Sequence, residues 1–384
     1  MDFLRSYAAY AGISEIPPQY TKWCGLMTLA AAAEDRVWVS KFRGKRIPPN
    51  LYVLLLGPSG IGKGEAIDTA LRLIAPLNIR TYRGKLTAPF LVDELASRKQ
   101  APKMLFVTPE LALSVGSGQL ADDLIKLMTE LFTGGDYVFQ EGTRTHRRHT
   151  FTGHNLNWLA GTTKEWLRDC VSQEAVRGGF FGRVASVSAS YNLDARVYHP
   201  QYRPDHAALE QDLRLRLGAV QGVKGEMTLA PDAEALLEQW YMERPSPTDE
   251  SMTPTWKREH DLVLRLAMLC ALGESAGVEI RVRHVVQAQR LAAETQRHLP
   301  QLVEYVALSR ETDGLRQVRE MLRRAKMLPR TAIIRTMAQA GVTEDRTKLF
   351  LETLIQAGQV TLSKTTNGRP AYLWHGRAAP KEDA

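Results

Sequence analysis

The residues with the clearest potential for chemistry are a group of glycines followed by a lysine. The group follows six apolar residues, 51–56, and consists of Gly57, Pro58, Ser59, Gly60, Ile61, Gly62, Lys63, Gly64 and Glu65. Glycines let successive backbone N–H groups point to one side, and such a concavity at the start of a helix binds phosphate. Lys63 would add a positive charge for the β- and γ-phosphates. The stretch is therefore expected to bind ATP.

The glycine spacing agrees with the P-loop motif, but one position differs from it. Four residues separate Gly57 from Gly62 and Lys63, as the motif requires. The next residue is Gly64, where Ser or Thr would offer a hydroxyl to Mg²⁺. Phosphate binding survives this difference, whereas the metal ion loses a protein ligand. The alternative is a glycine-rich turn between a strand and a helix that binds no ligand.

A second apolar segment ends in an acidic residue. Residues 103–108 are predicted to form a strand, and Pro109 and Glu110 follow it. A P-loop ATPase places carboxylates after such a strand, where they orient the attacking water and hold the shell of Mg²⁺. Glu110 fits the first role, whereas Pro109 occupies the position of the usual Asp. The alternative is that Glu110 caps the following helix.

Two hydroxyl groups and one arginine complete the candidate catalytic set. Thr162 and Thr163 end a third apolar segment, where a polar side chain could sense the γ-phosphate, although Thr163 could equally cap the next helix. Arg183 follows a Gly-Gly-Phe-Phe-Gly phrase, 178–182, and precedes another predicted strand. It could reach the γ-phosphate bound to a neighbouring subunit and stabilise transition-state charge. An ordinary ion pair is the alternative for this arginine.

The overall charge favours a polyanionic partner. The 384 residues carry a net charge of +8, which points to nucleic acid, although a basic surface that binds nothing is the alternative. Basic residues that could contact DNA phosphates lie in a predicted hairpin over 137–151 and near the C-terminus. They are Arg144, Arg147, Arg148, Arg346, Lys348, Lys364 and Arg369. A solvated hairpin is an equally good interpretation of the first three.

The elements that must position these residues indicate an α/β fold. Fully apolar strands suit a parallel sheet that is covered on both faces. We expect an N-terminal helical segment over 1–48, an ATPase core over 49–200 and a helical lid over 201–310. Within the lid, Arg258 or Arg265 could approach a nucleotide, or could simply be exposed helix arginines.

The C-terminal pattern is separate from this core. Helices over 314–326, 331–340 and 343–357 precede a hairpin of 360–363 with 370–374, whose turn contains Asn367 and Gly368. This order resembles a winged helix-turn-helix over 311–376. Such a unit binds DNA or, alternatively, another protein. The polar tail, 377–384, is expected to be disordered.

Composition narrows the class further. With 44% hydrophobic and 24% charged residues, the chain is typical of soluble globular proteins of two or three domains. Its apolar runs are far too short to span a bilayer, and the first residues lack the regions of a signal peptide. Cys24, Cys170 and Cys270 have no metal-binding spacing, which favours reduced thiols in the cytoplasm. No metal site is expected from the histidines, because no Cys or carboxylate completes His146, His149 and His154.

Several short segments together resemble a family of phage and prophage P-loop ATPases. Its members are described as primase/helicase-like or as containing a domain of unknown function. The segments are 48–60, Glu110-Leu, 159–163 and Gly178-Gly-Phe-Phe-Gly-Arg183. The resemblance covers about 1–310 and implies a RecA/AAA+-like core, use of ATP and Mg²⁺, and subunits assembled in a ring, commonly a hexamer. It would make Lys63 the phosphate lysine, Glu110 the catalytic acid, Thr162 or Thr163 the sensor and Arg183 the trans-acting arginine.

These patterns support one leading hypothesis and two rivals. The first is a DNA-dependent ATPase of phage or mobile-element type, a ring-forming replicative helicase or translocase acting on single-stranded DNA with primase or other replication proteins. The second is a nucleotide-gated DNA-binding or helicase-loader protein with little or no hydrolysis, which Gly64 and Pro109 favour. The third is a transcriptional regulator built on the C-terminal unit.

Overall fold

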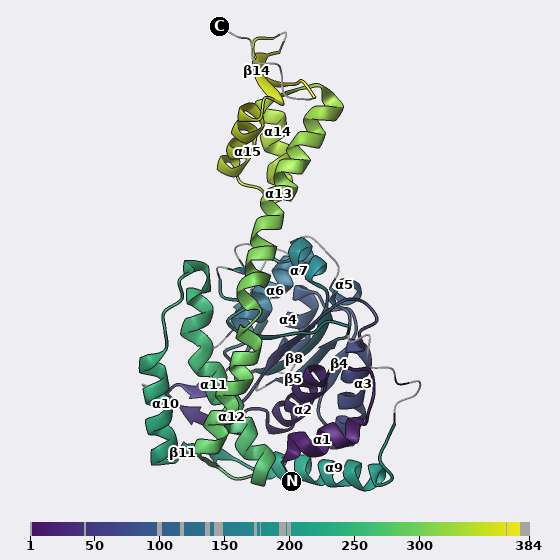
Figure 1. Ribbon diagram of the computed structural model, residues 1–384, viewed down its shortest axis with the longest axis vertical. Helices are drawn as coiled ribbons and strands as arrows, with labels where there is room; N and C mark the ends of the chain where they lie inside the picture. Colours follow the sequence, from purple (N-terminus) through teal and green to yellow (C-terminus); the bar gives the residue numbers. More distant parts are fainter. Residues whose placement is uncertain are drawn as a thin grey trace. The chain divides into compact units, whose positions relative to one another are not determined.

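The computed structural model divides the chain into two compact units, residues 1–303 and 304–384 (Figure 1). It describes residues 2–41, 44–97, 102–115, 119–134, 139–141, 149–172, 175–176, 178–191, 197, 201–365 and 367–376. Helix α13 (Leu299–Ala325) contains the boundary between the units, so the predicted helix over 314–326 is the second half of a longer one.

A five-stranded sheet forms the centre of the first unit. Its strands are β3 (Tyr52–Leu56), β4 (Thr81–Arg83), β5 (Lys103–Thr108), β8 (Asn155–Thr162) and β9 (Val184–Ser188). Their order is β4-β5-β8-β3-β9, and every neighbouring pair is parallel. The α/β class is confirmed at this level, and the arrangement is compatible with a Rossmann-like core. The sequence did not predict β4, because three exposed or half-buried residues carry no apolar run.

Alternate residues of these strands face opposite sides of the sheet, as the strand period of two requires. Val53 and Leu55 join the large apolar core that contains helix α2 (Pro18–Ala33). Tyr52 points the other way, where its ring meets Phe132 and Trp158 edge-on, with centroids 4.9 and 5.7 Å away. Both faces are thus covered, which explains why β3 is apolar at every position.

Helices surround this sheet. They are α1 (Phe3–Ala11), α3 (Lys63–Ile74), α4 (Ala88–Ala96), α5 (Leu111–Ser114), α6 (Gln119–Leu131), α7 (Lys164–Cys170), α9 (His206–Gly222), α10 (Pro231–Glu243), α11 (Thr253–Ser275) and α12 (Val282–Gln296). Helix α2 packs against β3, β8 and β9 on one side and against α1, α3 and α9 on the other. A helix enclosed in this way is apolar all round, which agrees with the run Leu29–Ala33 at its end. Helices α11 and α12 lie side by side (Figure 1).

Short strands complete the first unit. Within the segment 1–48, which was expected to be helical, β1 (Val37–Ser40) and β2 (Arg46–Ile47) form an antiparallel pair, and β1 also pairs with β10 (Gly225–Glu226). Strands β11 (Thr228–Leu229) and β12 (Glu279–Ile280) form a parallel pair.

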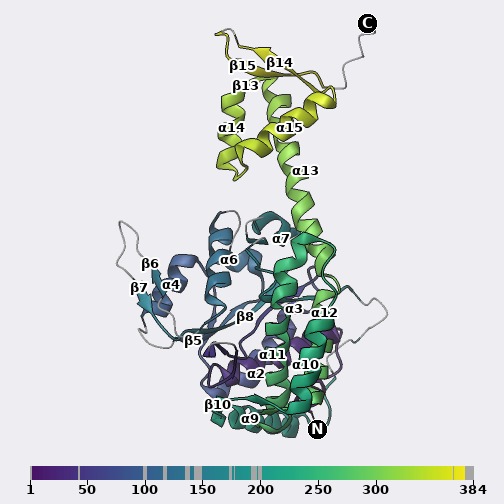
Figure 2. The same ribbon diagram turned by 90° about the vertical axis from the view of Figure 1, so that its left-hand side faces the viewer.

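The strands of the predicted basic hairpin are also present. They are β6 (Phe139–Glu141) and β7 (His149–Phe151), which pair antiparallel beside α4 (Figure 2). Its candidate DNA-binding residues, Arg144, Arg147 and Arg148, lie outside the described residues.

The second unit contains two further helices and a small antiparallel sheet. Helices α14 (Arg330–Gln339) and α15 (Glu344–Gln356) and the hairpin of β14 (Val360–Lys364) and β15 (Pro370–Trp374) lie where the sequence predicted them. A third strand, β13 (Met327–Pro329), pairs with β15 and was not predicted. It begins after Lys326, whose φ of 62° ends α13 abruptly. The core includes Val318, Leu322, Ile333, Met337 and Leu354.

Within the described part of the chain, no helix combines the length and the apolar character needed to cross a membrane.

Candidate functional site

The turn between β3 and α3 depends on glycines with left-handed backbone conformations. Gly60 has a φ of 80°, and Gly62 has a φ of 89° and is the N-cap of α3. Residues with a Cβ rarely adopt such values, so the turn depends on glycine at these two positions. We call residues Gly57–Gly62 the glycine turn. It lies at the carboxyl end of β3, the edge at which open α/β sheets bind ligands.

The N-terminal helices support this turn from behind. The Tyr20 hydroxyl donates a hydrogen bond to the Leu56 carbonyl at 2.6 Å. It would also lie only 2.5 Å from a Cβ at Gly57, and Ile16 Cγ1 would lie 3.1 Å from a Cβ at Gly62. Burial raises the pKa of Tyr20 well above its usual value, so its hydroxyl stays a donor. The glycines therefore also serve close packing, which the motif alone did not indicate.

Lys63 lies at the start of α3, with its ammonium group turned back over the glycine turn. Its Nζ donates to the Gly57 and Pro58 carbonyls, both at 2.7 Å. Burial lowers the pKa of Lys63, and the negative charges of Glu110 and Glu165 oppose this effect. The two carboxylates are thus close enough to influence the lysine. Glu165, in the first turn of α7, was not among the predicted residues because nothing in its spacing distinguishes it.

Gly161 brings the ends of β5 and β8 together beside the lysine. A Cβ at this position would lie 2.3 Å from the Pro109 carbonyl oxygen and 3.5 Å from Lys63 Cβ. Only glycine therefore fits between these groups. A glycine within a strand often marks such a close approach of backbones, so the sequence contained this signal.

The two threonines after β8 have different environments. Thr163 accepts a hydrogen bond from the Trp166 backbone N–H at 3.3 Å, so it caps α7, as one of its two interpretations predicted. Thr162 is 3% exposed, and its hydroxyl has no hydrogen-bond partner among the described residues. A buried hydroxyl without a partner costs free energy, so Thr162 is an exception among the buried polar groups of this sheet.

Glu110 follows β5 at the same edge of the sheet. It occupies the N-cap position of α5, yet its side chain makes no capping hydrogen bond and is exposed. The capping role that was its alternative interpretation is therefore absent. Lys63, Glu110, Thr162 and Glu165 all follow or end strands at the carboxyl edge of the sheet, and Gly161 lies beside Lys63 there.

Arg183 lies at the opposite edge of the sheet. It immediately precedes Val184, which pairs with Tyr52 at the start of β3, whereas the glycine turn follows the end of that strand. Five residues of strand separate the two edges by roughly 16 Å. Arg183 Nη1 donates to the Gly178 and Gly179 carbonyls, each at 3.1 Å. Within one chain, therefore, this arginine does not belong to the site around Lys63.

The two helix arginines of α11 also lie away from the glycine turn. Arg265 is 3% exposed, and it donates to the Pro48 carbonyl and to Asn50 Oδ1 while its guanidinium stacks on Phe132 at 4.6 Å. Arg265 thus holds the backbone that leads into β3, and it cannot approach a nucleotide at the glycine turn. Arg258 donates to the Pro254 carbonyl at 3.1 Å and lies beside Arg183.

The candidate DNA-binding residues of the second unit differ in their exposure and in their ion pairs. Lys348 pairs with Glu344 and Asp345 of its own helix at 3.1 and 3.2 Å, and these carboxylates raise its pKa. Arg346 is half-buried on the same helix. Lys364 and Arg369 are exposed on the β14–β15 hairpin. The acidic start of α15 therefore neutralises part of the predicted basic surface.

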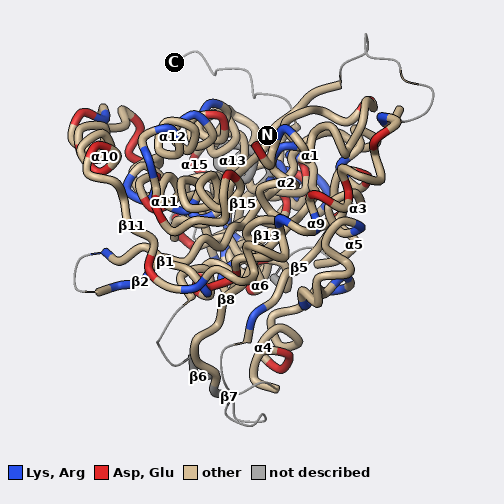
Figure 3. Tube along the Cα trace, turned by 90° about the horizontal axis from the view of Figure 1, so that it is seen from below, with Lys and Arg blue, Asp and Glu red and all other residues tan. Residues whose placement is uncertain are grey.

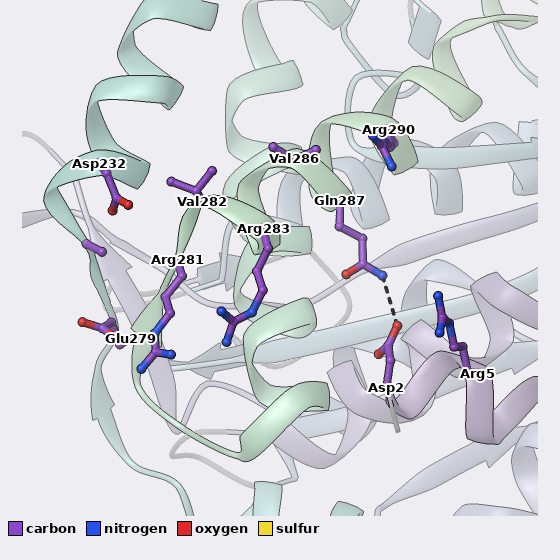
Figure 4. A pocket seen from close by; sticks show the side chains of 11 residues that line it. Asp2, Arg5, Asp232, Glu279, Arg281, Val282, Arg283, Val286, Gln287 and Arg290 are labelled. Atoms are coloured by element: carbon purple, nitrogen blue, oxygen red, sulfur yellow. Dashed lines mark hydrogen bonds and ion pairs between the residues drawn. The ribbon is translucent and has the colours of Figure 1, made fainter.

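A wide groove of about 860 Å³ lies elsewhere in the first unit, between the start of α1 and α12 (Figure 4). Four arginines and three carboxylates line it, and Arg281 pairs with Glu279, while Arg283 pairs with Glu274 outside the groove. In the described parts of the chain, Lys and Arg segments and Asp and Glu segments are interspersed (Figure 3). Because its charges largely cancel, the groove offers no strong attraction to an anion.

Comparison with known proteins adds no relationship. No model of a known protein family matches the chain, and no curated protein matches it significantly. The resemblance to phage and prophage ATPases therefore stays a prediction.

Proposed function

We propose that the chain is a P-loop ATPase that acts on DNA. The main support is a turn with two left-handed glycines, with Lys63 after it and with Glu110 and the unpartnered Thr162 hydroxyl at the ends of the two next strands of the sheet. Three separate strand ends contribute to this edge, as expected for a nucleotide site in an α/β sheet.

Phosphate binding would depend on the glycine turn and Lys63. The N–H groups at the start of α3 and the helix dipole favour an anion. Lys63 now contacts two carbonyls of the turn, and it would exchange these for phosphate oxygens. Burial lowers the pKa of Lys63, and the negative charges of Glu110 and Glu165, which favour the charged form, oppose this effect.

Hydrolysis would require Glu110 to orient and polarise a water molecule, with Thr162 donating a hydrogen bond at the same edge. Mg²⁺ would neutralise charge on the phosphates. The residues fit this ion in part: Glu110 and Glu165 provide carboxylates for its water shell, whereas Gly64 provides no hydroxyl. Nucleotide binding is accordingly better supported than rapid turnover.

The position of Arg183 and the fold of the C-terminal unit suggest how ATP hydrolysis would be coupled to movement on DNA. Because Arg183 lies far from Lys63 in one chain, it would act on a nucleotide bound to another copy in a ring. The helices α14 and α15 with the three-stranded sheet have the order of a winged helix-turn-helix, and Lys364 and Arg369 extend from its hairpin. This combination favours a helicase or translocase on single-stranded DNA.

A second function, a nucleotide-gated DNA-binding or loader protein, is favoured by Gly64 and Pro109. These residues replace the two side chains that would hold Mg²⁺ most directly. Exposed Leu349 on α15 and Leu362 on β14, at 54% and 67%, also suit contact with a protein partner. Such a protein would bind ATP and change its DNA affinity with little turnover.

The decisive experiment measures ATP binding and steady-state ATPase activity with and without single-stranded DNA. Lys63→Ala removes a charge-assisted contact worth about 1.5–3 kcal/mol, so ATP affinity should fall roughly 10- to 100-fold. Lys224→Ala, at an exposed lysine, is the control. DNA-stimulated turnover that Lys63→Ala abolishes supports the ATPase, and binding without turnover supports the gated protein. No binding of ATP at millimolar concentration would refute both.

A further inference from the structure

The edge of the sheet opposite the glycine turn contains a small cavity rich in positive charge. It has a volume of about 150 Å³ and lies between the start of β9, the start of α11 and β2. Its basic lining residues are Lys45, Arg46, Arg183, Arg258 and Arg265. We call it the arginine cavity.

The positive charge of this cavity is not balanced by its acidic residues. Two carboxylates line it, Glu259 and Asp261, against five basic side chains. Glu259 pairs with Arg244 at 3.2 Å and Asp261 pairs with Lys41, and neither partner lines the cavity. Within the lining, the charge of Asp261 also acts on Arg265, which leaves Arg183 and Arg258 without a carboxylate of their own. An uncompensated cluster of cations costs free energy unless an anion enters it.

Two of the guanidinium groups lie next to each other. A Cβ placed on Gly179 would be 2.6 Å from Arg258 Nη1 and 3.2 Å from Arg183 Nη1, so both nitrogens approach one point. Burial, together with the nearby charge of Arg258, lowers the pKa of Arg183 to about 10, which leaves it charged at neutral pH. Neither arginine forms an ion pair within the described part of the chain.

The Gly178–Arg183 phrase creates this arrangement. Gly179 has a φ of 82°, and a Cβ on Gly182 would lie 3.1 Å from both Arg258 Cδ and the Thr255 Cα. Side chains at these two positions would push Arg258 away from Arg183. The known contacts of the pair use carbonyls only, and each guanidinium has five N–H donors, so several donors remain for a ligand.

We propose that the arginine cavity is an anion site, separate from the glycine turn, that binds a terminal phosphate group between Arg183 and Arg258. Its volume is below the ~300–1,000 Å³ of sites for whole small molecules, so a phosphate fits but a complete nucleotide does not. Paired guanidinium groups recognise phosphate oxygens through parallel N–H bonds. A phosphodiester within a strand carries sugars on both sides, whereas a terminal phosphate can enter from one side.

Two molecules could supply such a group: a nucleotide bound to another copy of the chain, or the 5′ end of a nucleic acid. The proposal does not require the glycine turn to bind ATP. The test therefore uses the full-length chain with Lys63→Ala, in which the phosphate affinity of the glycine turn is weakened. A negative result would then refute the anion site without refuting the proposed ATPase function.

Tripolyphosphate is titrated into this Lys63→Ala protein by calorimetry. We expect saturable binding that Arg183→Gln or Arg258→Gln weakens at least about tenfold, as the loss of a charge-assisted contact predicts. Lysine at either position should retain part of the affinity. Arg290→Gln, which removes an exposed arginine of the wide groove, is the matched control and should bind normally. Absence of saturable binding, or equal binding by all variants, would overturn the proposal.

The thermal unfolding midpoint provides a second measurement, which shows whether a substitution disturbs the fold. If Arg258 serves a ligand, Arg258→Gln in phosphate-free buffer should unfold at the same or a higher temperature, because it relieves repulsion with Arg183. A lower midpoint for Arg258→Gln, with unchanged tripolyphosphate affinity, would show a purely structural arginine and overturn the proposal.

Competition identifies the source of the phosphate. Displacement of tripolyphosphate by ATP indicates a nucleotide, and displacement by a 5′-phosphorylated but not a 5′-hydroxyl strand indicates a nucleic-acid end. Competition by neither would mean that only an adventitious ion binds, and the proposal would fail.

Discussion

Gly64 allows a sharp test of the proposed nucleotide site, because two substitutions at this position differ by one oxygen atom. A Cβ at Gly64 would meet no atom within 4 Å, so the structure accommodates either serine or alanine. Gly64→Ser would place a hydroxyl where a P-loop holds Mg²⁺, and Gly64→Ala would add the same Cβ without the oxygen.

The expected magnitudes follow from the position of Gly64 in the first turn of α3. Without nucleotide, helix propensity should stabilise the chain by about 0.5 kcal/mol for serine and about 1 kcal/mol for alanine, or somewhat less at a helix end. With ATP and Mg²⁺, the hydroxyl should strengthen binding by about 1 kcal/mol, roughly fivefold, relative to alanine.

The assay measures ATP affinity for both variants, once with Mg²⁺ and once with EDTA, and urea unfolding without nucleotide. We expect equal affinities in EDTA and tighter binding by Gly64→Ser in Mg²⁺. Equal affinities for the two variants under both conditions would show that position 64 does not face a metal–nucleotide complex. That outcome would refute the proposed orientation of ATP on the glycine turn.

Two further predictions concern stability. Gly161→Ala would place a Cβ 2.3 Å from the Pro109 carbonyl, and this overpacking should cost about 2 kcal/mol in urea unfolding, whereas Gly64→Ala should cost nothing. His154 is 1% exposed, and burial lowers its pKa to about 4, from about 6.5 in the unfolded chain. The unfolded state therefore binds the proton first, so stability should fall by about 3 kcal/mol as the pH drops from 6.5 to 4. Unfolding curves of His154→Gln, which keeps a donor for the Leu131 carbonyl, should lack this part of the pH dependence; an unchanged pH profile would contradict the buried neutral histidine.

Strong apolar patterns made much of the fold predictable. Strands β3, β5 and β8 are runs of buried residues, and glycine or proline marks most of their ends, so they were found near their observed bounds. The hairpin β14–β15 followed from its Asn367-Gly368 turn. Strands β4 and β13 were missed, because each has only three residues, none of them fully buried, and is held by its neighbours in the sheet.

The candidate site likewise contains residues that local sequence patterns predict and residues that only the tertiary structure reveals. Lys63 and Glu110 could be proposed from the sequence, because glycine spacing and a strand-end acid are local features. Thr163 had two interpretations, and only the observed hydrogen bond to the Trp166 N–H separated them. Glu165 was missed, because its proximity to Lys63 arises where two distant helices begin near one edge of the sheet.

The sequence by itself determined which residues can form the glycine turn, since only glycine readily adopts the φ values of Gly60 and Gly62. It also determined that β3 must be buried on both faces. The tertiary structure alone decided that Arg183 lies at the edge opposite Lys63 and beside Arg258, 75 positions later in the chain. Strand direction and helix packing create this juxtaposition, and spacing along a sequence does not encode such a long-range contact.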